Sequence, residues 1–166
     1  LISQMGDLSE FTANENIDAS GLAVAPGLIN MLSWATQPLI VDGRALSDIK
    51  QGVTLEVMGE GRSMGPLNDK MKANEKRRQS NIKFDIEWTT LNEYLEYIVN
   101  KGVSVNVASY VGATTIRVHE IGYEDREPTN EELLRMQELV RQAMRDGALG
   151  VGSSLIYTPA NFAKTD

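Results

Sequence analysis

The fold is decided by residues 128–156, which read PTNEELLRMQELVRQAMRDGALGVGSSLI. Thr129 and Glu132 have the spacing of a capping box, which marks the start of a helix. Apolar residues then recur at helical spacing until Gly147, a residue type that often follows the last turn of a helix. The run after this glycine is apolar and rich in glycine, which indicates a strand that another backbone approaches closely. The sequence therefore predicts a helix that ends at Gly147 and a strand over 148–156.

The chain before this stretch alternates in the same way between apolar runs and helical patterns. Residues 22–32 are almost wholly apolar, which suits a strand buried on both faces of a parallel sheet. The same criteria predict strands at 53–58 and 103–111, and helices at 44–51 and 90–102. This order of strands and helices predicts an α/β architecture with parallel strands. The polar run at 70–78 indicates a solvated surface helix or insertion, to which we assign no function.

The composition excludes several classes of protein. The 166 residues carry 16 Lys and Arg against 23 Asp and Glu, a formal charge of −7, so a dedicated nucleic-acid binder is not expected. No apolar run approaches the roughly 18 residues that span a bilayer, so membrane insertion is not expected. The absence of cysteine excludes disulfides, iron–sulfur clusters and thiolate zinc sites. Because His119 is the only histidine, a site of several histidines cannot form within this chain.

Two side chains near predicted strand ends are candidates for chemistry. Glu60 lies between two glycines directly after the strand at 53–58, where parallel α/β folds place functional groups, although an N-cap or a surface acid fits its position equally well. His119 lies between a predicted strand and a predicted helix, and a structural hydrogen-bonding role is favoured because no motif supplies a catalytic partner. The pair Gly150-x-Gly152 indicates close packing, since a dinucleotide site needs a third glycine and a helix start.

Several segments together resemble one enzyme family. They are GLAVAPGLIN at 21–30, SDIKQGVTLEVMGEG at 47–61, VNVASYVGATTIR at 105–117 and, as the longest, DREPTNEELLRMQELVRQAMRDGALGVGSSLIYTPANFA at 125–163. In this order they are similar to the amino-terminal part of the D-aminoacylase branch of the amidohydrolase superfamily, the N-acyl-D-amino-acid deacylases. The resemblance implies a partial (β/α)₈ TIM barrel, with about the first four βα units in residues 23–166. It also implies that residues 1–22 are the lead-in and a remnant of the small β-sandwich domain of that family.

The resemblance implies a zinc site whose ligands match this chain only in part. The family's first ligand pair, the His-x-His of P-G-F-I-D-x-H-x-H, falls on Leu32 and Trp34, which offer a metal no usable lone pair. The cysteine of the family's N-C-G-x-S falls on Glu60, and a carboxylate can also bind zinc. The later histidine ligands and the catalytic aspartate are expected beyond Asp166. Tyr157, in the family's L-I-Y, is the candidate for binding the substrate, and an amphipathic ring at the barrel rim is an equal alternative.

The activity implied by the resemblance is hydrolysis of the carbon–nitrogen amide bond of N-acyl (D-)amino acids by metal-activated water, in a larger protein of which this chain is a fragment. The alternative is a non-catalytic relative that has lost the metal site and acts as a binding or structural protein. Loss of both histidine positions favours this alternative, whereas the ligand-capable Glu60 favours the enzyme. The chain alone is expected to be inactive and to hold no tight zinc, because Glu60 and His119 fall short of three converging ligands.

The expected partner of the larger protein is a small N-acyl amino acid. An open half of a barrel exposes two unpaired sheet edges, so self-association through these edges is expected where no other segment pairs with them. A cytoplasmic location is favoured. A periplasmic or secreted location stays open because the amino terminus, which begins at Leu1, looks cut.

Overall fold

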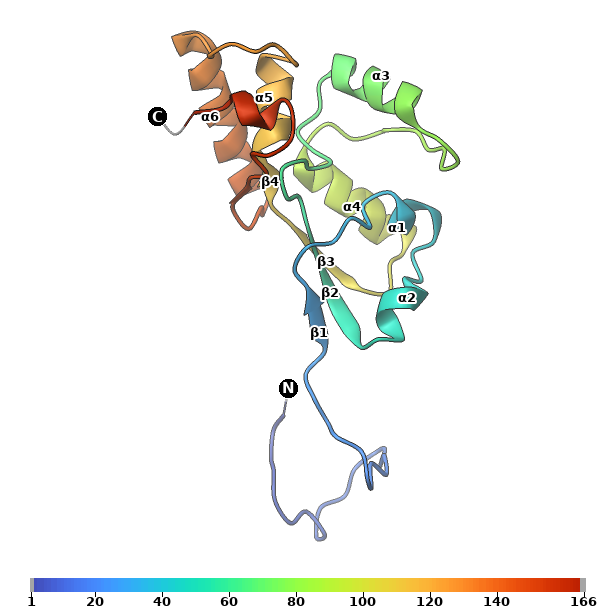
Figure 1. The fold of residues 1–166 in the computed structure, drawn as a ribbon. Helices are drawn as coiled ribbons and strands as arrows, with labels where there is room; N and C mark the ends of the chain where they lie inside the picture. Colours follow the sequence, from blue (N-terminus) through green and yellow to red (C-terminus); the bar gives the residue numbers. More distant parts are fainter. Residues whose placement is uncertain (1, 165–166) are drawn as a thin grey trace.

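The described part of the chain is residues 2–164 of a computed structural model. An extended lead-in is followed by short parallel strands, against which helices pack (Figure 1). Residues 2–27 contain no helix or strand, and nearly all of them are exposed. None of the helices in the described residues is long and apolar enough to cross a bilayer.

In residues 2–164, five short strands form two parallel sheets. The first sheet has the order β1-β2-β3, with β1 over Leu28–Asn30, β2 over Val53–Met58 and β3 over Asn106–Ser109. The second sheet pairs β4, Val111–Gly112, with β5, Val151–Gly152. Only Tyr110 separates β3 from β4, and the backbone N–H of Leu149 donates to the Ser109 carbonyl at 2.9 Å. The α/β class and the parallel strands are thus as the sequence predicts.

The helices differ in length and in the origin of their stability. Two long helices, α4 over Leu91–Lys101 and α6 over Asn130–Arg145, start at the predicted capping boxes, and in both the side-chain and backbone halves of the box are formed. The polar helix α3, Asp69–Arg78, confirms the surface helix predicted at 70–78. The remaining helical segments are α1 over Pro38–Val41, α2 over Leu46–Ile49, α5 over Ala113–Glu120 and the 3₁₀ turn η1 over Ala160–Phe162.

Three predicted strands are shorter in the structure. The segment 22–32 keeps only β1, and it is not buried on both faces, because Leu28 and Ile29 remain 56% and 54% exposed. The segment 103–111 divides into β3 and β4 because its partner changes from β2 to β5 at Tyr110. The segment 148–156 keeps only β5, since β4 offers two residues for pairing. Apolar runs alone therefore overestimated strand length where the pairing partner is short.

Helix α5, over residues that follow the strand predicted at 103–111, is absent from the sequence prediction. Its first turn contains Thr114 and Thr115, and β-branched residues have a low helix propensity. Both threonines are buried, and each contacts the loop that follows β2 through a hydrogen bond. Tertiary contacts therefore stabilise a helix that local propensity disfavours. His119 consequently lies inside this helix and not in a connection between elements.

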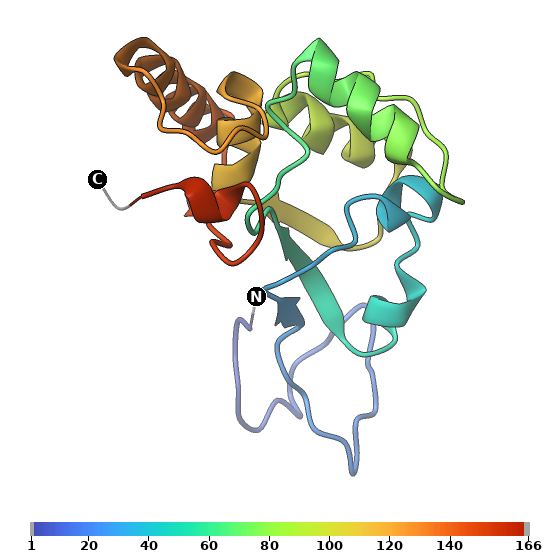
Figure 2. The ribbon, with the colours of Figure 1, turned by 45° about the horizontal axis from the view of Figure 1, so that its top comes forward.

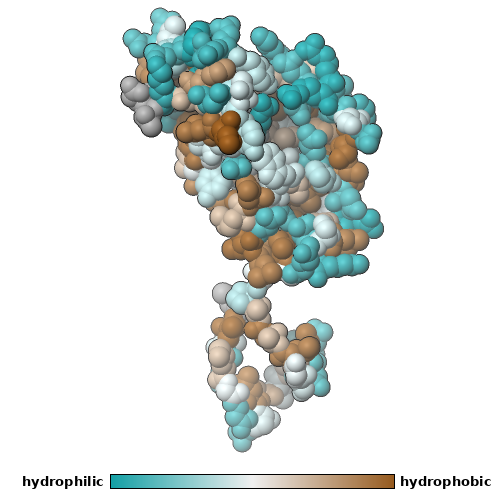
Figure 3. Space-filling view, viewed as in Figure 1, coloured by the Kyte–Doolittle hydropathy of each residue, from teal (hydrophilic) through white to brown (hydrophobic). Residues whose placement is uncertain are grey.

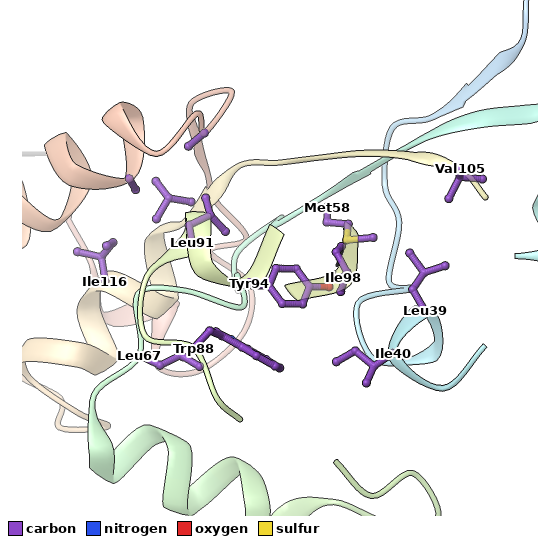
Figure 4. Packing of buried hydrophobic residues seen from close by; sticks show 13 residues of the cluster. Leu39, Ile40, Met58, Leu67, Trp88, Leu91, Tyr94, Ile98, Val105 and Ile116 are labelled. Carbon is purple, nitrogen blue, oxygen red and sulfur yellow. Dashed lines mark hydrogen bonds between the residues drawn. The ribbon is translucent and has the colours of Figure 1, made fainter. Parts of the chain in front are cut away.

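The hydrophobic core lies between β2 and the helices that cover it (Figure 4). Tyr94 and Ile98 of α4 are fully buried, and the Tyr94 hydroxyl donates to the Thr36 carbonyl at 3.0 Å. Trp88 packs its ring against Tyr94 with the ring centroids 5.2 Å apart. The carboxyl ends of the strands lie at one end of this layer, and the site described below is found there.

The start of α6 is stabilised by a charged network that acidification should weaken. Hydrogen bonds from the Arg126 guanidinium at 2.7 and 2.8 Å, together with the Thr129 backbone N–H, lower the pKa of Glu132 to about 2. A carboxylate with a lowered pKa in the folded state stabilises the fold above its unfolded pKa of about 4.5, and this contribution is lost as the pH falls toward 2.

We therefore expect Glu132→Gln to lower the melting temperature at pH 7, and the difference from wild type to shrink between pH 5 and pH 2.5. Glu131→Gln removes the same charge from the same helical turn and serves as the matched control. Thermal unfolding followed by circular dichroism measures both variants across this range. A difference between Glu132→Gln and wild type that does not change with pH would contradict the assigned role of the network.

Candidate functional site at the strand ends

The loop after β2 holds Glu60 at the carboxyl end of the strand. Gly59 and Gly61 have φ angles of 92° and 66°, in the region that favours glycine, so the backbone turns sharply on both sides of Glu60. The loop is fixed to the start of α5, because the Thr114 backbone N–H donates to the Gly61 carbonyl at 2.9 Å. Three further hydrogen bonds join Ser63 to this helix start. The position of Glu60 is therefore set by rigid neighbouring elements.

The ends of β4 and β5 approach this loop so closely that only glycine fits. A Cβ atom added to Gly152 would lie 2.7 Å from the Gly59 carbonyl oxygen and 3.2 Å from Glu60 Cα. A Cβ atom added to Gly112 would lie 2.4 Å from the Gly61 carbonyl oxygen. The packing role predicted for the glycines of 150–152 is thus confirmed for Gly152. The carboxyl ends of three strands meet at Glu60.

Glu60 lines a cavity of about 500 Å³. The end of β1 contributes Trp34 to the same cavity, and Arg62 and Tyr123 lie on its wall, with the Arg62 guanidinium carbon 5.9 Å from the Tyr123 ring centroid. Helix α3 supplies Arg78 to the lining. The cavity therefore places the carboxylates of Glu60 and Glu75 among aromatic and cationic side chains, which suits a small polar ligand with an apolar part.

Of the other residues singled out from the sequence, only Trp34 lines the same cavity as Glu60. Leu32 and Trp34 are 52% and 63% exposed, so the positions of the family's histidine pair present an alkyl chain and an indole. His119 lies in α5, its Nδ1 is 2.9 Å from Glu120 Oε1, and it does not line the cavity. Tyr157 is 66% exposed after β5 and is also outside the cavity lining.

The described residues fit a zinc ion only in part. Within residues 2–164 no group of three or more His, Asp or Glu side chains is arranged to hold a metal ion. Leu32 and Trp34 cannot supply ligands, whereas the Glu60 carboxylate can. The described residues therefore offer the Glu60 carboxylate at the strand ends but do not complete a metal site.

A buried acid, Glu56, is missed by the sequence patterns. In the sequence it only interrupts the apolar strand at 53–58, yet its side chain is 1% exposed in β2. Asn30 Nδ2 donates to Glu56 Oε2 at 3.0 Å, and among the described residues Glu56 Oε1 has no hydrogen-bond partner. Burial raises the pKa of the Glu56 carboxyl, opposed by the Ser33 hydroxyl and the Asn30 amide and reinforced by the Asp48 carboxyl. An acid inside an otherwise apolar strand was the available signal.

Solved structures define the class of protein. A D-aminoacylase structure concerned with the role of a binuclear metal centre superposes on the chain with a TM-score of 0.83 and 30% identity, over 99% of this chain and 35% of that one. An N-acyl-D-glutamate deacylase from Bordetella bronchiseptica, in complex with zinc and a phosphonate inhibitor, gives a TM-score of 0.75 and 26% identity, over 96% of this chain and 33% of that one. The α/β fold therefore resembles that of the D-aminoacylase-type amidohydrolases.

Curated relatives narrow this class to one branch. The D-aminoacylase of Alcaligenes xylosoxydans xylosoxydans is 32% identical over 169 residues, which is 99% of this chain and 34% of the relative. The N-acyl-D-aspartate deacylase of the same organism is also 32% identical, over 99% of this chain and 33% of the relative. The chain is thus a homologue of the D-aminoacylases, and the resemblance predicted from the sequence is confirmed. It spans about a third of the length of these relatives. No protein-family model matches it.

Proposed function

We propose that this chain is the amino-terminal part of a metal-dependent amidohydrolase that hydrolyses the amide bond of N-acyl (D-)amino acids. The observation that carries the proposal is the position of Glu60, held by glycine contacts where the carboxyl ends of β2, β4 and β5 meet. In barrels of parallel strands this end of the sheet is the catalytic end. The homology to deacylases of N-acyl amino acids supplies the class of substrate.

The proposal includes a partial (β/α)₈ barrel in residues 23–166, with residues 1–22 as lead-in and remnant of a β-sandwich domain. The strand order supports it, because β1, β2, β3 with β4, and β5 follow one another side by side in chain order, as barrel strands do. Apolar side chains beside the outer strands also support it, since Leu28, Ile29 and Val151 are more than half exposed. Brown hydrophobic patches lie on this face in Figure 3. Further strands, or a second copy of the chain, would bury this surface.

Glu60 is the side chain of this chain that would hold a zinc ion, with imidazole ligands supplied from outside it. When bound, zinc would supply Lewis acidity for the attack of water on the amide. The residues of this chain bind and orient the substrate. Trp34 and Tyr123 offer apolar walls for the acyl group, and Arg62 offers a positive charge in the same cavity. Tyr157 remains a candidate for binding the substrate's carboxylate from the loop after β5.

A non-catalytic binding protein is the second candidate function. The observation that favours it is the replacement of both residues of the family's His-x-His by Leu32 and Trp34, which removes half of a binuclear site. The enzyme is favoured over it because three protein ligands suffice for a catalytic zinc site, and the Glu60 position retains a ligand-capable side chain.

The test is hydrolysis of N-acyl-D-amino acids by the whole protein that contains this chain. We expect activity that is lost after treatment with a chelator and restored by stoichiometric zinc, because the metal supplies the electrophile. The isolated 166 residues are expected to be inactive with or without zinc. Saturable binding of the N-acyl amino acid without hydrolysis, in the presence of zinc, would contradict the enzyme and support the binding protein.

A further inference from the structure

The cavity between β2 and the short helices α1 and α2 contains a cluster of oxygen atoms. Side chains alternate along a strand, so Glu56 points to the same face of β2 as Met58, whose Sδ lies 3.8 Å from the Tyr94 hydroxyl in the core beneath α4. Glu56 therefore faces the helix layer. There it lines a cavity of about 560 Å³ together with Asn30, Ser33 and Asp48. Figure 2 shows α2, which carries Asp48, beside β2.

The Glu56 carboxylate is incompletely satisfied. Its Oε2 accepts one hydrogen bond, from Asn30, and its Oε1 accepts none from any described residue although the side chain is 99% buried. A buried carboxylate without partners is strongly disfavoured, and a second acid facing the same cavity adds repulsion. Asp42 lines the cavity too, but its charge is compensated by two hydrogen bonds from Arg44, each at 2.8 Å. The Glu56 carboxylate therefore needs either a proton or a cation to compensate its charge.

We propose that Glu56 and Asp48 bind a hydrated Mg²⁺ ion in this cavity. The lining side chains that can bind a metal ion would do so through oxygen atoms, which suit a hard cation. Ca²⁺ needs six to eight oxygen ligands, whereas Mg²⁺ keeps several waters and is bound by one or two carboxylates, which is what this cavity offers. The site does not involve Glu60, so the Mg²⁺ proposal is tested independently of the hydrolase proposal.

The test is thermal unfolding and isothermal titration of the chelator-treated protein with MgCl₂ at pH 7.5, with NaCl of equal ionic strength as the blank. We expect saturable binding of one Mg²⁺ and a rise in melting temperature of about 4 °C when free Mg²⁺ is tenfold above its Kd. Glu56→Gln keeps an oxygen acceptor for Asn30 and should fold, but it should lose the binding and the shift. Asp48→Asn should weaken the binding at least tenfold.

Two control variants separate this site from the other acids of the chain. Asp42→Asn changes an acid in the same cavity that Arg44 already neutralises, and Glu60→Gln changes the candidate zinc ligand; both should retain the Mg²⁺ response. An equal response in Glu56→Gln would overturn the proposal, as would the absence of saturable binding to wild type. In the latter case, stabilisation of the wild type but not of Glu56→Gln on acidification to pH 5.5 would show that a proton, and not Mg²⁺, satisfies Glu56.

Discussion

Glu60→Gln in the whole protein is expected to lower kcat/KM for N-acyl-D-amino acids by at least about 100-fold. The substitution keeps the size of the side chain but removes the charge that would bind zinc. Loss of a group that only supports a metal ligand already costs about 10- to 100-fold in metal affinity or activity, so loss of a ligand should cost at least the upper value. Steady-state kinetics measure the loss of activity, and the zinc content of the purified variant measures the loss of metal binding.

The matched control for this variant is Glu87→Gln, which removes an exposed acid away from the cavity. It should leave kcat/KM within about twofold of wild type. If Glu60→Gln retained wild-type activity and wild-type zinc content, Glu60 would be an ordinary acid at the strand end. The hydrolase proposal would then depend on homology alone.

Trp88→Ala is expected to destabilise the fold by about 3–5 kcal/mol, the usual range for truncating a large aromatic residue in a core. The Trp88 ring is 1% exposed and packs against Tyr94 and Tyr97, with ring centroids 5.2 and 4.9 Å apart. Its Nε1 donates to the Met64 carbonyl at 2.6 Å, so truncation also leaves a part-buried carbonyl without its partner. Urea unfolding followed by far-UV circular dichroism gives the free energy of unfolding.

The second tryptophan of the chain supplies the control for stability. Trp34 is 63% exposed, so Trp34→Ala should change the free energy of unfolding by no more than about 0.5 kcal/mol. A loss of less than 1 kcal/mol in Trp88→Ala would contradict the packing of the helices around this ring (Figure 4).

Elements with complete local signals could be predicted from the sequence. The capping boxes at Thr90 and Thr129 fixed the starts of α4 and α6, and the apolar run ending before Gly59 fixed β2. Helix α5 could not be predicted, because its threonines are stabilised by hydrogen bonds to a loop some 50 residues earlier in the chain. The lengths of the strands could not be predicted for a similar reason, since each length depends on the partner strand.

The site follows the same division between local and distant information. The position of Glu60 after a strand and between glycines was visible in the sequence, because both features are local. Its cavity was not, since Arg78 and Tyr123 reach it from other parts of the chain. The environment of Glu56 was equally hidden, because Asp48 and Asn30 approach it from α2 and β1. Where the chemistry of a side chain depends on neighbours that are distant in sequence, the structure is needed to predict it.

The most direct test of the proposed site is a crystal structure of the whole protein grown with zinc, with the metal located by its anomalous scattering. We predict a Glu60 carboxylate oxygen at about 2.0–2.2 Å from the zinc ion, with imidazoles completing the coordination. A zinc ion bound at the strand ends with Glu60 outside ligand distance would contradict this assignment.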